Sequence, residues 1–220
     1  MATFGGPNTV ETGLIVSVDA ANPTSYVSGS TIWQDLSGNN NSGSLVSGPA
    51  FSTDAGGNIV FDGSNKRATL TTPFGKSGFT SVSIWYNRIE SVSSTSWRTL
   101  FATAATNVHH LISQNTTRVL GVFDGSFRSF GYTPPIDGKF HNYSVVYQSA
   151  TDATLYVDGI FFSTISIILN LETSPIGSIG NWTSGTYWAG SIATSQIYNR
   201  ALSASEIQQN YNAMRGRFGI

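Results

Sequence analysis

Cysteine is absent from this 220-residue sequence, and charged side chains make up only 10% of it. Without thiols the chain can form no disulfide, no thiolate metal site and no cysteine nucleophile. The formal net charge of −1 provides no basic surface of the kind that binds nucleic acid. We therefore exclude thiol chemistry and expect no nucleic-acid partner.

A leader and a long apolar run are missing as well. The first ten residues, MATFGGPNTV, lack the basic and apolar regions of a secretory signal. The most apolar stretch, Ile160–Leu171, is interrupted by serine and threonine and is too short to cross a bilayer as a helix. The sequence thus predicts a chain that is made in the cytoplasm and does not insert into membranes.

Aromatic residues and short alternating segments, in contrast, are abundant. Five Trp, nine Tyr and thirteen Phe supply bulky side chains for a core. Val82, Ile84 and Tyr86 alternate with serine and asparagine, which is typical of a strand with one buried face. On this pattern Trp85 falls on the polar face, and we expect it to be partly exposed.

About a dozen short strands are predicted in all, with glycine, aspartate and asparagine between them. The most evident are Leu14–Asp19, Ile59–Phe61, Phe79–Asn87, Arg98–Ala102, Arg118–Phe123, Phe140–Gln148, Leu155–Val157 and Ile192–Tyr198. The pair Asp158-Gly159 after the seventh of these predicts a tight β-hairpin.

One helix is predicted near the C-terminus. Ser203 and Glu206 have the spacing of a capping box, in which each side chain accepts a hydrogen bond from the other's backbone N–H. Three apolar residues then recur at helical spacing, namely Ile207, Tyr211 and Met214. Gly216 is expected to end the helix.

These elements predict an all-β fold, an antiparallel two-sheet jelly-roll sandwich with one short C-terminal helix. No internal repeat or linker divides the chain. We expect a flexible lead-in over residues 1–12, a jelly-roll domain over 13–211 and a basic tail over 212–220.

Several motifs resemble those of laminin-G-like, concanavalin A-like jelly-roll domains. In chain order they are Trp33–Asn41 (WQDLSGNNN), Val60–Ser64 (VFDGS), Leu155–Gly159 (LYVDG), Gly190–Ile192 (GSI) and Ile197–Ser203 (IYNRALS), followed by Glu206 and Ile207. The resemblance extends from about Leu14 to Tyr211 and implies a lectin-like sandwich. It departs from the family at Ala193 and Ser195, where an acidic residue and a valine are usual.

The last ten residues carry a second resemblance. Tyr211–Ile220 (YNAMRGRFGI) is similar to the ends of such domains in tailed-bacteriophage virion proteins, especially those of marine and cyanobacterial phages. Within it, Arg215 and Arg217 have two alternative roles. They either pair with carboxylates of a neighbouring subunit or remain solvated where they complement the helix dipole.

Catalysis is not expected. Glycoside hydrolases of this fold family carry their carboxylates on one strand as Glu-x-Asp-x-x-Glu, and the sequence has no such run. It also has no Gly-x-Ser-x-Gly elbow. Turn formation accounts for the aspartates that directly precede glycine, namely Asp62, Asp124, Asp137 and Asp158. Asp35 is predicted to cap a loop.

Metal binding is not expected either. His109 and His110 are adjacent on a strand, so they point to opposite faces and cannot easily share a ligand. We assign them, with His141, to packing or to the surface. Many relatives of this fold bind calcium at a loop rim, and the loops here offer oxygen atoms from Asp62, Asn65 and Asp124. Our prediction is no cofactor, with calcium as the alternative.

Two tryptophans are the candidate carbohydrate-binding residues. Trp97 and Trp182 lie among turn residues, and exposed aromatic rings of this kind stack on sugar faces in such sandwiches. The alternative is an apolar lid on the sandwich or a subunit contact. Trp33 and Trp188 occupy positions that the family resemblance assigns to the core.

The leading functional hypothesis is a non-enzymatic structural protein on the exterior of a phage virion, as a capsid decoration or fibre-like component. Its partners would be other virion proteins of the capsid or tail, host surface glycans that it adheres to, and copies of itself in a homo-oligomer. A virion protein needs no export signal because lysis releases it. The alternative is a carbohydrate-binding, lectin-like module whose main task is recognition.

Overall fold

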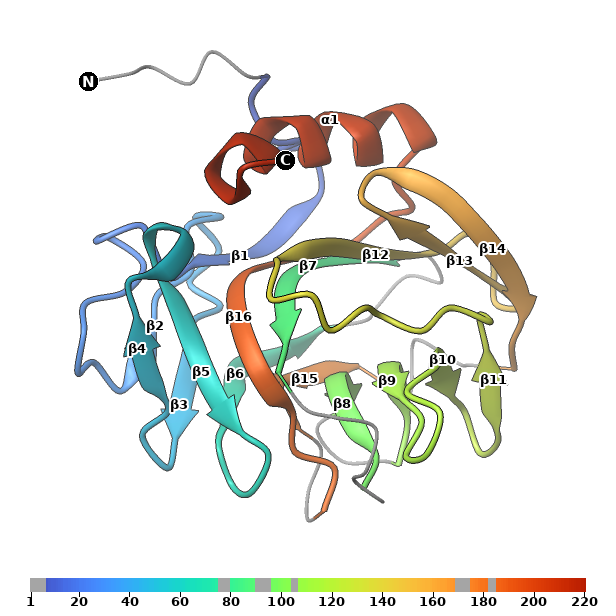
Figure 1. Cartoon of the computed structure of the whole chain (residues 1–220). Helices are drawn as coiled ribbons and strands as arrows, with labels where there is room; N and C mark the ends of the chain where they lie inside the picture. Colours follow the sequence, from blue (N-terminus) through green and yellow to red (C-terminus); the bar gives the residue numbers. More distant parts are fainter. Residues whose placement is uncertain (1–6, 75–79, 90–95, 104–106, 169–174, 182–184) are drawn as a thin grey trace.

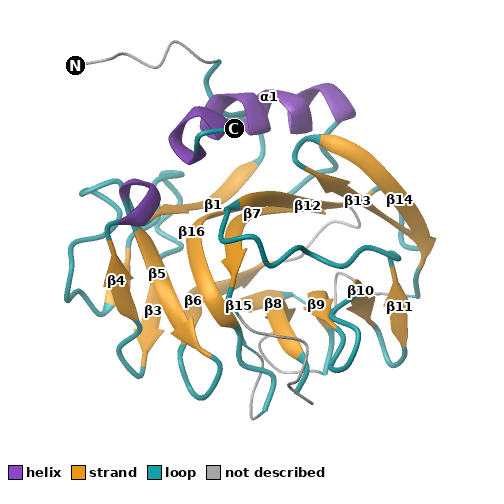
Figure 2. Cartoon of the chain, in the orientation of Figure 1, coloured by secondary structure: helices purple, strands orange, loops and turns teal. Residues whose placement is uncertain are grey.

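The computed structural model describes residues 7–74, 80–89, 96–103, 107–168, 175–181 and 185–220. These residues form sixteen strands, one α-helix and two short 3-10 helices. The strands make two antiparallel sheets that stack face to face (Figure 1), and helices occupy little of the chain (Figure 2). The predicted two-sheet jelly-roll sandwich with one C-terminal helix is confirmed.

Each sheet has eight strands. Sheet I runs from edge to edge as β14 (Ile160–Ser166), β13 (Asp152–Val157), β12 (His141–Tyr147), β7 (Thr80–Arg88), β16 (Ala189–Tyr198), β5 (Asn58–Asp62) and β4 (Ala50–Ser52), and β1 (Leu14–Asp19) also pairs with β16. Sheet II runs as β11 (Phe127–Ser129), β10 (Leu120–Phe123), β9 (His109–Ser113), β8 (Arg98–Thr103), β15 (Ile176–Ile179), β6 (Arg67–Phe74), β3 (Gly43–Val46) and β2 (Ile32–Trp33).

The hydrophobic core lies between the two sheets. Val82, Ile84 and Tyr86 of β7 are buried there, as their alternation predicts. Trp33 and Trp188 are 0% and 1% exposed, so their predicted place in the core is confirmed. Residues of the opposite parity point away from the core, and on sheet I they meet a second layer formed by the end of the chain.

The C-terminal helix α1 (Ala204–Met214) lies over the outer face of sheet I (Figure 1). The predicted capping box is present, because Ser203 accepts from the Glu206 N–H and Glu206 accepts from the Ser203 N–H. A 3-10 helix, η2 (Arg215–Phe218), follows directly. None of the described helices is long and apolar enough to span a membrane.

Gly216 was predicted to end the helix. The α-helix itself ends at Met214, but the chain continues through Gly216 as the 3-10 helix η2 and leaves helical conformation only after Phe218. The first glycine in the left-handed conformation that breaks a helix is Gly219, with φ of 73°. Gly216 lies inside η2 and does not adopt positive φ. A glycine in sequence therefore marked the right region but not the right residue.

Trp85 is buried rather than partly exposed. Its side chain lies on the outer face of β7, yet it is only 2% exposed. Tyr211 of α1 stacks on it with ring centroids 5.6 Å apart, and Phe218 of η2 stacks on it at 4.2 Å. The prediction from alternation was wrong because these rings come from the far end of the chain and exclude water from this face.

Described residues near both ends of the chain pack on the sandwich. Within the predicted lead-in, the Val10 N–H donates to Oδ1 of Asn210 in α1 at 2.7 Å. Within the predicted tail, Arg217 pairs with Asp19 of β1 at 2.6 Å. This arginine therefore binds a carboxylate of its own chain, and the C-terminal residues are part of the outer layer of sheet I.

Two local predictions are also confirmed. Asp35 caps its loop, because its carboxylate accepts from the Ser17 and Ser37 N–H groups at 2.8 and 2.9 Å. Asp158 and Gly159 join β13 to β14, with φ of 49° and 77°. Positive φ at both residues is the conformation of the two-residue hairpin turn that this pair favours.

Candidate functional site

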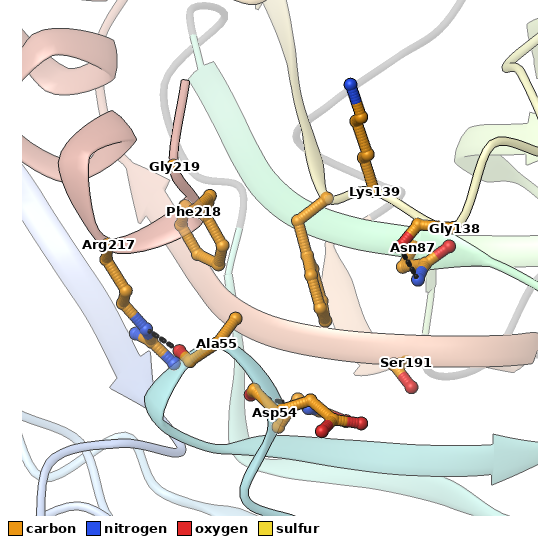
Figure 3. Close-up of a pocket in the computed structure, with 11 residues that line it drawn as sticks. Asp54, Ala55, Asn87, Gly138, Lys139, Ser191, Arg217, Phe218 and Gly219 are labelled. Atoms are coloured by element: carbon orange, nitrogen blue, oxygen red, sulfur yellow. Dashed lines mark hydrogen bonds between the residues drawn. The ribbon is translucent and has the colours of Figure 1, made fainter.

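A pocket opens on the outer face of sheet I beside η2, with a volume of about 440 Å³ (Figure 3). It lies where the outer layer formed by α1 and η2 ends and the strands of the sheet are uncovered. The described residues that line it are Asp54, Ala55, Asn58, Asn87, Gly138, Lys139, Phe140, Ser191, Arg217, Phe218 and Gly219.

Adjacent strands place small and polar side chains in a row across the pocket. Ser191 of β16 is the register partner of Asn87 of β7, and partners in an antiparallel ladder lie about 5 Å apart. The next residues along these strands, Ile192 and Tyr86, belong to the core. Because side chains alternate, Ser191 and Asn87 both point outward into the pocket.

Asn58, at the start of β5, adds a buried acceptor. Its side chain is 1% exposed, and its Nδ2 donates to the Asp54 carbonyl at 2.9 Å. Its Oδ1 is buried and accepts no hydrogen bond from the described residues. A buried amide oxygen without a donor costs about 1–3 kcal/mol. Because this oxygen has almost no accessible surface, it belongs to the wall of the pocket and is not a contact offered to a ligand.

Aromatic rings provide the apolar part of the lining. Phe140 and Phe218 pack against each other with ring centroids 5.2 Å apart. Figure 3 shows Phe218 and Ala55 on one side of the pocket and Asn87, Gly138 and Lys139 on the other. Asn87 Nδ2 donates to the Gly138 carbonyl at 3.0 Å, which ties the turn before β12 to β7.

The charged groups of the lining have different tasks. Arg217 donates to the carbonyls of Ala55, at 2.6 Å, and Gly57, and it pairs with Asp19. It therefore fixes η1 (Asp54–Gly56) against η2 and does not offer a spare charge. Asp54 and Lys139 are exposed at the rim, one of each sign, so the pocket carries no strong net charge.

This arrangement suits a small ligand with both hydroxyl groups and C–H faces. Hydroxyl groups donate and accept, which matches the amide group of Asn87 and the hydroxyl group of Ser191. The C–H faces of such a ligand would pack against phenyl rings. Of the described residues in the lining, Asp54 is the one carboxylate.

The two tryptophans predicted to bind carbohydrate lie elsewhere. Trp97 is half-buried just before β8 in sheet II, where its ring contacts Phe127 edge to face at 5.2 Å. It is not part of the pocket lining. Trp182 lies outside the described residues. A role for either ring as a stacking platform stays a prediction.

The acids named for calcium have other contacts and do not come together with each other. Asp62 lies near Lys66 at 3.7 Å and accepts from the Ser64 N–H. Asp124 is bonded by Arg128 at 3.0 Å and accepts from the Ile168 N–H. No cluster of three or more His, Asp or Glu that could hold a metal ion occurs in the part of the chain that the structure describes.

The predicted packing role of the paired histidines fits their surroundings. His109 is bonded to Thr99 Oγ1 at 2.8 Å, and burial lowers its pKa to about 4. The His110 ring packs edge to face on Tyr147 at 5.6 Å. His141, in contrast, lies at 2.8 Å from Asp158 and 3.2 Å from Asp137, next to the pocket.

Comparison with protein families gives one match. The model described as the concanavalin A-like lectin/glucanases superfamily (Laminin_G_3) matches residues 61–208. No curated protein sequence matches. Among solved structures, the chain is similar to domain 4 of AbnA, an extracellular arabinanase of family GH43 from Geobacillus stearothermophilus, in complex with arabinotriose. The identity is 17%, the TM-score is 0.68, and 92% of this chain and 100% of that chain are covered.

Two further similar structures are of chains that are longer than this one. The chain is similar to a sialidase from Trypanosoma rangeli in complex with sialic acid, with 14% identity, a TM-score of 0.66 and 93% of this chain but 33% of the sialidase covered. It is also similar to the binding domain of botulinum neurotoxin serotype D, with 15% identity, a TM-score of 0.65 and coverage of 93% and 52%. At these identities the likeness concerns the fold alone.

Proposed function

We propose that this chain binds saccharides. The premise is that the chain belongs to the concanavalin A-like lectin/glucanases superfamily. The binding site is the pocket on the outer face of sheet I. The observation that carries this proposal is the combination, in one pocket, of the polar side chains of Ser191 and Asn87 with two phenylalanine rings.

A saccharide supplies what these groups require. Its hydroxyl groups would exchange hydrogen bonds with Ser191 and Asn87, and its ring C–H groups would contact Phe140 or Phe218. Specificity for hydroxyl positions is strong in such sites because an unmatched analogue leaves a buried polar group unpaired. A pocket of about 440 Å³ lies within the usual range for small-molecule sites.

The similar structures suggest the first ligands to test. Arabinotriose is present in the structure of AbnA domain 4, and sialic acid is present in that of the Trypanosoma rangeli sialidase. These two probes differ in charge, so they also report whether a neutral or an acidic sugar suits the rim formed by Asp54 and Lys139. A broad glycan array would extend the set.

The decisive variant is Ser191→Leu, which fills the pocket without removing a structural hydrogen bond. Its matched control is Ser44→Leu, at an exposed site on β3 of the other sheet. With the best probe, calorimetric titration should show affinity at least about tenfold lower in Ser191→Leu, or about 1.4 kcal/mol, and no change in Ser44→Leu. If Ser191→Leu binds as the wild type does, or if only Trp97→Ala or Trp182→Ala abolishes binding, the pocket is not the site.

We propose further that the domain is not an enzyme. Glycosidases flank the bond that they cleave with two carboxylates, whereas Asp54 is the one acid among the described lining residues. Incubation of the pure domain with β-glucans and with arabinotriose should release no reducing sugar. Turnover that Asp54→Asn removes would contradict this proposal.

The second candidate function is that of a structural protein on the exterior of a phage virion. Besides the resemblance of Tyr211–Ile220, the described surface offers an apolar edge where another protein can pack. Ile160, Phe161 and Phe162 of the edge strand β14 are 68%, 59% and 42% exposed, and exposed apolar strand edges favour association with other chains. Mass spectrometry of purified particles tests this role, and consistent absence of the chain from the particles would end it.

A further inference from the structure

One wall of the pocket is held by a histidine between two carboxylates. His141 Nδ1 lies 2.8 Å from Asp158 Oδ2, and His141 Nε2 lies 3.2 Å from Asp137 Oδ2. Asp137 begins the turn that continues through Gly138 and Lys139 to Phe140, and these last three residues line the pocket. We name Asp137, His141 and Asp158 the latch.

The two carboxylates are anchored unequally. Asp158 Oδ1 accepts from the Asn142 N–H at 2.8 Å, and the Asp158 N–H donates to the Asn142 carbonyl at 2.8 Å. Among the described residues, Asp137 accepts from the Lys139 N–H of its own turn, at 3.0 Å, and lies in contact with His141. The side chain of Asp158 is 25% exposed and that of Asp137 is 38% exposed. Asp158 is therefore the fixed side of the latch and Asp137 the weaker side.

Only the imidazolium form of histidine can donate from both ring nitrogens. Neutral His141 keeps one N–H, and the shorter contact places it on Nδ1 toward Asp158. Nε2 then presents a lone pair to the Asp137 carboxylate, and the attraction at 3.2 Å becomes repulsion. The turn retains the hydrogen bond from Asn87 to Gly138 but loses its tie to β12.

We propose that the latch makes the pocket sensitive to protons: protonated His141 holds the Asp137–Phe140 wall in its binding position, and loss of this proton loosens the wall and weakens saccharide binding. This inference rests on the proposed function of the pocket. It assigns to His141 a positioning role, because its ring does not line the pocket itself.

The direction of the pKa values agrees with this geometry. The hydrogen bond to Asp158, and then that to Asp137, raise the pKa of His141 above its usual 6.5, although burial opposes them. At Asp137, burial acts to raise the pKa of the carboxyl, but the hydrogen bonds from the Lys139 N–H and from His141 outweigh it, so that this pKa is lowered. The imidazolium is thus favoured in the folded protein and is lost as pH rises through this raised pKa.

Other titratable groups around the latch keep their charge in this range. From the preceding loop and from β12 these are the hydroxyl groups of Tyr132 and Tyr143, whose pKa values burial raises above 10. From α1, Tyr211 faces Asp158 and also has a raised pKa. Arg215 lies beside the Tyr211 ring. Histidine is the side chain whose ordinary pKa lies closest to neutral pH, so His141 is the group of the latch that we expect to change its charge.

The test compares saccharide affinity at about pH 5.5 and about pH 8.5, on either side of the usual titration range of histidine. The probe is arabinotriose or a tighter ligand from the array. The affinity of the wild type for the saccharide should be about fivefold lower at the higher pH than at the lower pH, which is the lower end of typical coupling between linked sites. Asp137→Ala should bind equally at both values, because alanine can pair with neither form of the His141 ring. Asp152→Ala is the control, because Asp152 accepts from Ser149 and Thr151 in a different loop, and it should retain the wild-type pH dependence.

A second readout needs no ligand and separates the two proposals. NMR order parameters of Gly138 and Lys139 should fall from those of rigid backbone, about 0.85, towards those of flexible backbone, about 0.6, as His141 titrates. In Asp137→Ala they should be low at both pH values. If these order parameters stay constant while the His141 ring titrates, the latch is refuted, whatever binds. If they fall but no saccharide binds at either pH, the latch stands and the proposed function fails.

Discussion

Replacement of Phe218 by alanine tests whether the end of the chain is a structural cover of sheet I. The Phe218 ring stacks on Trp85 at 4.2 Å and packs on Phe140 at 5.2 Å. Truncation of a fully buried phenylalanine costs about 3–5 kcal/mol, but Phe218 is only partly buried. Its aromatic contacts add about 0.5–1.5 kcal/mol beyond the buried area. We expect a loss of about 2 kcal/mol in the free energy of unfolding.

Thermal and urea denaturation measure this loss directly. For a chain of this size, about 2 kcal/mol corresponds to a drop of about 4–8 °C in Tm. The matched control is Phe161→Ala, because Phe161 is 59% exposed and its nearest aromatic contact is Tyr156 at 6.1 Å. We expect the control to lose less than about 0.5 kcal/mol. Acrylamide should also quench tryptophan fluorescence more strongly in Phe218→Ala, because Trp85 loses its cover.

Equal losses in the two variants would refute this reasoning. They would mean that η2 does not contribute to stability and that Trp85 is covered by α1 alone. The pocket would then lack a fixed wall on the Phe218 side.

Two further predictions concern how α1 is held. Arg200, with help from Ser203 and against the effect of burial, lowers the pKa of Glu206 from 4.5 to about 2. Glu206 therefore adds stability above pH 4.5 that is lost as pH falls towards 2. The advantage of the wild type over Glu206→Gln in urea denaturation should shrink over this range, and a constant advantage would contradict the charged pairing of Glu206 with Arg200. Gly159→Ala should lower Tm more than Gly125→Ala. Both glycines have positive φ, so both substitutions strain the backbone, but only at residue 159 would the new Cβ also lie too close to another side chain, 2.9 Å from Tyr211 Cβ. Equal shifts would show that the hairpin turn does not press on α1.

Local patterns in the sequence predict much of this fold. The capping box at Ser203, the hairpin at Asp158-Gly159 and the inward residues of β7 each depend on neighbours a few positions away, so composition and spacing suffice. Trp85 shows where such reasoning fails. Its burial depends on Tyr211 and Phe218, more than a hundred residues later in the chain, and no periodicity records that contact.

The candidate site was missed for the same reason. Its lining comes from η1, three strands, the turn before β12 and η2, and each residue taken alone has an ordinary explanation. Asn58, Asn87 and Ser191 look like the polar face of any strand. The register of the sheet brings them together, and only the docked C-terminus makes a hollow beside them. The sequence signal for sugar binding is a tryptophan among turn residues, which predicts Trp97 and Trp182, and that prediction is not tested by the pocket.

The most direct test of the central claim is an NMR titration of the ¹⁵N-labelled domain with arabinotriose, sialic acid and the best ligand from a glycan array. If the pocket binds saccharide, the largest shift changes should fall on the Asn58 and Asn87 side-chain amides and on the Ser191 backbone amide. The Trp97 indole N–H should not move. Changes that centre on Trp97, or that leave all three pocket residues unaffected while a saccharide binds, would contradict the account.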